Sequence, residues 1–167
     1  MEDACTKPEC MLKRSTPREV DRRSFLFGIS GAAAFAALFP VDAAAAATPM
    51  VRSVETYREA LSLLAPRYRY ALIDIRADWC PACLRMEREV FPHPSVRQLL
   101  EHVALIKVDV TAMDDANRRL LSHLRADGPP TLFVIDIASG GEYEQTRTVG
   151  SLRRRDLIRR LQPFARG

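Results

Sequence analysis

The sequence predicts an α/β fold with a central mixed β-sheet flanked by helices, and three observations lead to this prediction. Apolar runs with the length of buried strands, at residues 70–77, 104–110 and 131–137, alternate with segments of helical spacing. A turn at Gly128-Pro-Pro precedes the third run. A second turn at Ser139-Gly-Gly is typical of a hairpin that returns an antiparallel strand. Parallel pairing through helical crossovers is therefore expected first, followed by a closing hairpin and a final helix.

The first two helices follow from their apolar spacing and their prolines. Tyr57, Leu61 and Leu64 recur on one helical face, and Pro66 ends this helix. The second helix, at residues 81–90, directly follows the first strand and begins with a proline. Proline suits the first helical position because its missing N–H is not needed there.

In the second half of the chain, helices are expected at residues 95–102 and 114–124, where leucines and valines repeat at helical intervals. An exposed strand across 143–149 is expected as the return strand of the hairpin. Ser151 is expected to cap a last helix whose inward face includes Leu157.

Composition limits the number of domains and the class of partner. A chain of 167 residues fits one domain with an appendage. The formal net charge is +4, and no segment interleaves basic with aromatic residues, so a nucleic-acid partner is not expected. The four cysteines are too few for a fold held together by disulfides. We expect the domain to be monomeric.

The N-terminal segment has the features of an export signal. Arg22-Arg23-Ser-Phe-Leu opens an apolar stretch at residues 25–39, which is short for a membrane span. It resembles a twin-arginine (Tat) signal peptide, followed by small residues suited to cleavage. We therefore expect a removable signal at 1–47, a folded domain at 48–167 and a periplasmic location. The alternative is an uncleaved signal that anchors the domain to the membrane, facing the periplasm.

Cys80-Pro-Ala-Cys83 stands where the first strand turns into a helix. Two cysteines with this spacing in α/β surroundings are typical of a redox-active disulfide. The Cys80 sulfur should face the unpaired N–H groups at the helix start, which favours its thiolate and makes it the attacking sulfur. Cys83, one turn later, is expected to be more buried than the exposed Cys80 and to resolve the mixed disulfide. Cys5 and Cys10 precede the fold and are expected to leave with the signal.

No metal and no cofactor is expected. A structural zinc site would need a second ligand pair, and the histidines are scattered along the chain at His93, His102 and His123. Haem attachment would need a histidine directly after Cys83, where Leu84 stands.

The motif is accompanied by further matching residues. These are the strand end and motif at 74–83, Glu87, Phe91, Val-Asp-Val-Thr at 108–111 and Gly-Pro-Pro-Thr at 128–131. The set resembles the thioredoxin fold and, more narrowly, the C-terminal periplasmic domain of the disulfide reductase DsbD. This resemblance implies a thiol–disulfide oxidoreductase that works in the reducing direction.

The resemblance also implies catalytic roles for two acids. Asp74, an acid in an apolar strand, would lie beneath Cys83 and exchange protons with it. Burial would raise its pKa. Glu87 follows one turn after Cys83, and its carboxylate would also approach the sulfurs. Two acids near a dithiol should raise the thiol pKa values. The alternative for Glu87 is a solvated helix residue.

Three further residues are expected to bind substrate. Pro130 matches the cis-proline that faces the cysteines in this fold, and an X–Pro bond is the natural place for a cis peptide. The residue before it offers its backbone to an extended substrate, but Pro129 has no N–H to donate. Trp79 would pack beside the sulfurs and limit access to them.

Other polar residues have simpler interpretations. Arg76 is expected to be a surface arginine at the strand end, or else a charge near the site that favours the thiolate. His93 is expected in a loop. The arginines of the last helix are expected to form a solvated face, with docking of an anionic partner as the alternative; they are Arg153, Arg154, Arg155, Arg159 and Arg160.

The sequence thus predicts an exported thiol–disulfide oxidoreductase that reduces protein disulfides through Cys80 and Cys83. Its expected partners are protein disulfide substrates and a membrane dithiol electron donor. The alternatives are a thiol oxidase or isomerase, or a non-enzymatic module of the same fold that binds a partner or carries a metal.

Overall fold

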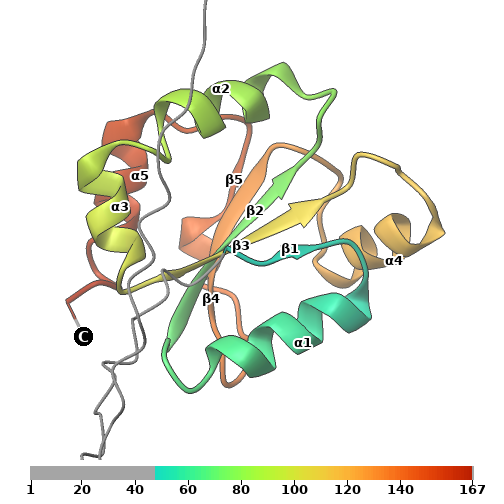
Figure 1. The fold of residues 1–167 in the computed structure, drawn as a ribbon, viewed down its shortest axis with the longest axis horizontal. Helices are drawn as coiled ribbons and strands as arrows, with labels where there is room; N and C mark the ends of the chain where they lie inside the picture. The colour runs from blue at the N-terminus through green and yellow to red at the C-terminus, as the bar shows by residue number, and fades with distance from the viewer. Residues whose placement is uncertain (1–47, 167) are drawn as a thin grey trace, which may run out of the picture. The chain divides into compact units, whose positions relative to one another are not determined.

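Helices cover both faces of a five-stranded mixed sheet in the part of the chain that the structure describes (Figure 1). The structure is a computed structural model, and residues 48–166 are described. The expected export signal at 1–47 lies outside the described residues. No helix within residues 48–166 is both long enough and apolar enough to cross a membrane.

The strands lie in the order β1-β3-β2-β4-β5 across the sheet. Their bounds are β1 Met50–Val51, β2 Tyr70–Arg76, β3 Ala104–Asp109, β4 Thr131–Asp136 and β5 Thr148–Val149. The central strand β2 pairs in parallel with β3 and antiparallel with β4. At the edges, β1 runs parallel to β3 and β5 antiparallel to β4. The predicted mixed sheet is confirmed.

Five α-helices of the described chain form a layer on each face of the sheet. Their bounds are α1 Val54–Leu64, α2 Pro81–Glu89, α3 Pro94–Leu100, α4 Asp115–His123 and α5 Arg154–Leu161. Figure 1 shows α1 and α4 on one side of the sheet and α2, α3 and α5 on the other. Two apolar clusters correspond to these two layers, except that Cys80 and Cys83 at the start of α2 belong to the cluster of α1 and α4.

Alternation along β2 decides which side chains face α2. Ile73 and Ile75 point into the cluster under α1 and α4. Leu72 points into the other cluster, under α2, α3 and α5. Because successive side chains of a strand point to opposite faces, Asp74 and Arg76 share the Leu72 side. The sheet therefore presents one acidic side chain, Asp74, and one cationic side chain, Arg76, toward the helix that bears the cysteines.

The strands of the sheet differ from the sequence prediction in two places. The pairing of β1 with Lys107 and Val108 was missed, because a two-residue strand has no periodicity to detect. The expected strand at 143–149 is wrong in its first part, where Glu144–Thr146 forms a 3₁₀ turn. The buried Thr146 hydroxyl accepts a hydrogen bond from the Val134 N–H at 2.8 Å, so a side chain replaces the expected backbone pairing.

The start of the last helix also differs. Ser151 does not cap α5, because the chain stays outside the helix until Arg153, which occupies the N-cap without a side-chain hydrogen bond. Leu152 is buried in this segment. The hairpin itself is confirmed: Gly140 has a φ of 68°, and its N–H donates to the Asp136 carbonyl at 2.9 Å.

Candidate active site

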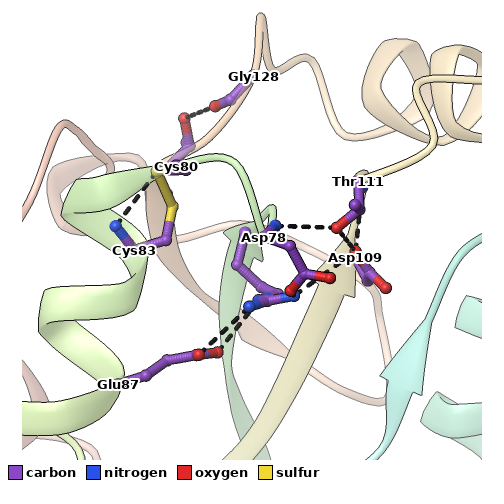
Figure 2. Close-up of a disulfide and its surroundings, with 9 residues drawn as sticks. Asp78, Cys80, Cys83, Glu87, Asp109, Thr111 and Gly128 are labelled. Carbon is purple, nitrogen blue, oxygen red and sulfur yellow. Dashed lines mark hydrogen bonds and ion pairs between the residues drawn. A yellow bond between two sulfur atoms is a disulfide. The ribbon is translucent and has the colours of Figure 1, made fainter.

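Cys80 and Cys83 form a disulfide at the junction of β2 and α2 (Figure 2). Cys80 is the N-cap of α2, and Pro81 occupies the first helical position as expected. The Cys83 N–H donates a hydrogen bond to the Cys80 sulfur at 3.2 Å. This N–H belongs to the first turn, whose unpaired donors and dipole favour negative charge on the capping atom. The helix start therefore stabilises a thiolate at Cys80 better than one at Cys83.

Both cysteines are largely buried. Cys80 is 5% exposed and Cys83 is 2% exposed, so the expected contrast in exposure is small. Position on the helix, rather than accessibility, distinguishes the two sulfurs.

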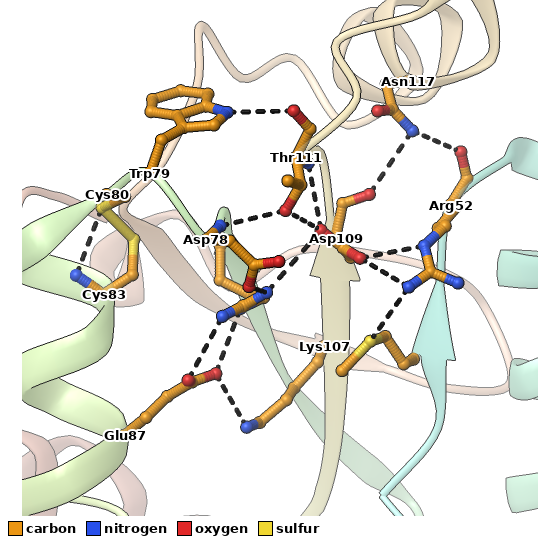
Figure 3. Close-up of polar contacts among 12 residues, drawn as sticks. Arg52, Asp78, Trp79, Cys80, Cys83, Glu87, Lys107, Asp109, Thr111 and Asn117 are labelled. Atoms are coloured by element: carbon orange, nitrogen blue, oxygen red, sulfur yellow. Dashed lines mark hydrogen bonds and ion pairs between the residues drawn. A yellow bond between two sulfur atoms is a disulfide. The ribbon is translucent and has the colours of Figure 1, made fainter.

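Trp79 is half-exposed and anchored away from the helix. Its indole N–H donates to the Thr111 carbonyl at 3.0 Å, and Figure 3 shows the ring directed toward Thr111. The Asp78 N–H donates to the Thr111 hydroxyl at 3.0 Å, and the Thr111 N–H donates to Asp109 at 3.0 Å. Thr111 thus ties the segment before the cysteines to the end of β3.

Asp74 is a buried acid whose carboxyl group has few stabilising polar contacts. Its side chain lies in the interior, only 2% exposed, and its Oδ2 has no hydrogen-bond partner. Burial raises the pKa of Asp74 to about 7, and the negative charge of Glu87 acts in the same direction. Lys107 and Arg76 oppose this rise without cancelling it. Asp74 can therefore gain or lose a proton near neutral pH.

Glu87 is neither a solvated residue nor free to approach the sulfurs. Its carboxylate accepts hydrogen bonds from Arg76 Nε at 3.1 Å and from Lys107 Nζ at 2.9 Å. Partial burial alone would raise the pKa of Glu87, but the hydrogen bonds and charges of Lys107 and Arg76 bring it below its ordinary value. The side chain extends from α2 toward the sheet, and Figure 2 shows its carboxylate in contact with a guanidinium rather than with either sulfur.

The surface position expected for Arg76 is wrong. This residue is only 5% exposed, because α2 covers the end of β2. Its guanidinium lies 2.7 Å from Asp78, 3.1 Å from Glu87 and 3.7 Å from Asp109. Sequence reasoning missed this cluster, although Asp78 and Glu87 stand two and eleven residues after Arg76. A charged residue on the inward side of a strand, with acids nearby in sequence, was the available signal.

The loop opposite the helix contains the expected proline pair. The Pro129–Pro130 peptide bond is cis, as predicted. The Gly150 N–H donates to the Pro130 carbonyl at 2.8 Å. The Thr131 hydroxyl donates to the Gly128 carbonyl at 2.6 Å (Figure 2). Both prolines are half-buried, and the loop is fixed on either side by its neighbours.

The histidine and the α5 arginines that the sequence singled out make local structural contacts. His93 caps α3, with its Nδ1 accepting from the Ser95 N–H at 3.3 Å. On α5, Arg153 and Arg159 pair with Asp156 at the surface. Residues 48–166 contain no group of three or more His, Cys, Asp or Glu side chains that could hold a metal ion.

The fold and the paired cysteines define a protein of the thioredoxin class. The profile of the thioredoxin-like family matches residues 52–136, just over half of the chain, so the chain belongs to this family. The predicted thioredoxin fold is confirmed by solved structures. The structure of this chain superposes on the oxidised C-terminal domain of DsbD from Neisseria meningitidis with a TM-score of 0.59 and 24% identity, covering 69% of this chain and 98% of that one. A thioredoxin from Thermus thermophilus gives 0.54 and 25%, covering 69% and 85%.

Curated relatives give the more particular similarity. The chain is 42% identical over 79 residues to the thiol:disulfide interchange protein DsbD 2 of Pseudomonas aeruginosa, covering 47% of this chain and 13% of that protein. It is 33% identical over 100 residues to DsbD of Escherichia coli K12, covering 60% and 17%. The chain thus spans less than a fifth of the length of these relatives. Its fold is that of the C-terminal domain of the Neisseria meningitidis DsbD.

Proposed function

We propose that this protein is an exported thiol–disulfide oxidoreductase that reduces protein disulfides. The observation that supports this most directly is the disulfide of Cys80 and Cys83 at the N-terminus of α2. The similarity to DsbD proteins favours the reducing direction over the alternatives of an oxidase, an isomerase or a non-enzymatic module.

The exchange would proceed through one covalent intermediate. In the reduced protein, the Cys80 thiolate attacks one sulfur of a substrate disulfide and displaces the other as a thiolate, which takes up a proton. Cys83 then loses its proton and attacks the Cys80 sulfur, releasing the second substrate thiol. Two electrons and two protons pass to the substrate, and the protein is left with the disulfide seen in Figure 2.

Asp74 is proposed as the group that exchanges a proton with Cys83. Its buried carboxyl group, with a pKa of about 7, is suited to accept a proton as Cys83 attacks. Trp79, Pro129 and Pro130 are proposed to contact the substrate, since the half-exposed indole and the fixed proline loop belong to the segments that follow β2 and precede β4.

Regeneration and location complete the proposal. The reduced form would be restored by a membrane dithiol donor, in a two-electron exchange that reverses the steps above.

The twin-arginine pattern at Arg22-Arg23 supports export to the periplasm. The test is subcellular fractionation of the full chain and of the Arg22→Lys/Arg23→Lys variant. Periplasmic wild type with a cytoplasmic variant is expected, and equal distribution of the two would contradict this route.

The activity is tested by insulin reduction with a dithiol donor. The full chain should accelerate precipitation of the insulin B chain, and Cys80→Ser should abolish the acceleration. Cys5→Ser/Cys10→Ser is the matched control and should retain full activity. Loss of activity in the control, or activity in Cys80→Ser, would contradict the proposal. Trapping with Cys83→Ala should then leave physiological substrates disulfide-linked to Cys80.

A further inference from the structure

Arg76 is a buried cation that the exchange reaction does not use. It lies at the end of β2, on the face of the sheet that α2 covers. Its guanidinium contacts three carboxylates from different parts of the fold: Asp78 before α2, Glu87 within α2 and Asp109 at the end of β3. A buried arginine is costly unless it is hydrogen-bonded, and here each of the three guanidinium nitrogens donates to a carboxylate.

The contact with Glu87 fixes the orientation of the carboxylate as well as its charge. Nε of Arg76 donates to Oε1 at 3.1 Å, and Nη2 donates to Oε2 at 3.3 Å. Two parallel hydrogen bonds of this kind restrict a carboxylate far more than one does. Lys107 adds a third bond to Oε1 at 2.9 Å from the neighbouring strand (Figure 3).

The position of Glu87 on the helix explains why this orientation matters. Glu87 follows Cys83 by four residues on α2, so the two side chains lie on the same helical face. A carboxylate released from Arg76 could turn along this face toward the sulfurs. Instead, Glu87 and Lys107 line an open groove of about 480 Å³ beside α3, which neither cysteine lines.

We propose that Arg76 is a positioning residue: it holds the ionised Glu87 carboxylate away from the cysteines and leaves Asp74 as the single carboxyl group that exchanges protons with them. The inference rests on the proposed function, in which Cys83 and Asp74 share a proton. It assigns to the cluster a purpose beyond stability, namely to keep the carboxylate of Glu87 out of the proposed proton exchange between Asp74 and Cys83.

The charges around Asp74 are consistent with this separation. Burial is the main cause of the raised pKa of Asp74; among the neighbouring charges, Lys107 and Arg76 lower this pKa and Glu87 raises it. Asp78 and Asp109 form ion pairs with Arg76, and Asp109 also forms one with Arg52 at 2.8 Å. The pKa of Glu87 lies below its ordinary value while that of Asp74 is about 7, so Asp74 alone of this pair titrates near neutrality.

The test is a carboxyl titration by ¹³C NMR of the reduced full chain, carried out with Arg76→Gln, Glu87→Gln and the double variant. Arg76→Gln should raise the pKa of Asp74 by about one unit, since a nearby opposite charge is lost and a like charge is released. The same change in the Glu87→Gln background should give about half that shift or less. Cys80 alkylation at neutral pH should slow about fivefold in Arg76→Gln and recover in the double variant.

Two results would overturn the inference. An unchanged Asp74 titration in Arg76→Gln would remove Arg76 from the site, and equal shifts in both backgrounds would show that it does not act through Glu87. Arg159→Gln, which removes an exposed arginine of α5, is the matched control and should change nothing. If Arg76→Gln does not fold, Arg76→Lys retains the charge without the paired hydrogen bonds and should show about half the shift. These titrations need no disulfide substrate, so they succeed or fail independently of the insulin assay.

Discussion

Asp74 and Lys107 are paired positions on the neighbouring strands β2 and β3, yet the Lys107 ammonium group bonds to Glu87 and leaves Asp74 without it. The available cation is therefore used to hold the acid on the helix. The acid on the strand remains buried, with Oδ2 unpaired. The burial of Asp74, together with this unequal division, gives two neighbouring carboxyl groups different protonation states at the same pH.

The first prediction concerns stability and pH. The pKa of Asp74 is about 7 in the folded protein and near 3.8 in an unfolded chain. Between these values the folded protein keeps a proton that the unfolded chain has released, so this group makes stability fall as pH rises from about 4 to about 7. Asp74→Asn removes the effect. In urea unfolding of the oxidised protein, the variant should match wild type near pH 4 and exceed it by roughly 2–4 kcal/mol near pH 8.

Asp115→Asn is the control for this experiment, because Asp115 is exposed and its pKa is lowered by the Arg118 side chain. It should give no gain at either pH. A gain from Asp74→Asn that is equal at both pH values would mean that Asp74 does not titrate between them.

The second prediction concerns thiol reactivity. If Asp74 shares a proton with the dithiol, the rate of Cys80 alkylation should show an inflection near pH 7 in the reduced wild type. This inflection should be absent in Asp74→Asn, whose amide cannot titrate. Peptide-resolved mass spectrometry follows Cys80 separately from Cys5 and Cys10. An identical pH profile in the two proteins would remove Asp74 from the proposed role.

How far the sequence predicted this site depends on the kind of signal. The Cys80–Cys83 pair was predictable because a short-range motif specifies it, and the cis bond before Pro130 was predicted from the resemblance to the thioredoxin fold. The sheet followed from apolar runs. The burial of Arg76 was not predictable from its own neighbourhood, because it depends on Asp109 from β3 and on coverage by α2. Such contacts join segments that only the tertiary fold brings together.

The same limit explains the errors near the C-terminus. Ser151 is a good N-cap by residue type, but the chain enters α5 two residues later and buries Leu152 on the way. Residues 144–146 have no sequence signal for a 3₁₀ turn, which is stabilised by the Thr146 hydroxyl donating to the Tyr143 carbonyl at 2.6 Å. In both places, burial of one side chain overrode the local pattern.

The third prediction concerns the threonine that anchors the motif. Thr111→Val keeps the shape of the side chain but removes the hydroxyl that accepts from the Asp78 N–H. It also leaves the buried Asp109 with one donor fewer. We expect a loss of about 1–3 kcal/mol in the free energy of unfolding, measured in urea. Ser62→Ala, which removes an exposed helix hydroxyl, should cost far less. Equal losses would show that the anchor contributes nothing specific.

The last prediction concerns substrate binding at the proline loop. A substrate that adds to this loop as an extended strand would use backbone donors as well as acceptors. Pro129 offers none, although it lies half-buried in a loop that Thr131 and Gly150 fix by hydrogen bonds. Pro129→Thr restores one N–H and keeps an X–Pro bond at Pro130. One additional hydrogen bond of about 0.5–1.5 kcal/mol should lower the KM for insulin roughly two- to tenfold, with kcat little changed.

Pro66→Thr is the matched control for this variant, because it makes the same exchange at an exposed position after α1. It should leave KM unchanged. If Pro129→Thr raises KM or leaves it unchanged while the fold is retained, the substrate does not use a backbone donor at this position. In that case the rigidity of the proline pair, and not its missing N–H, would be the property that matters for binding.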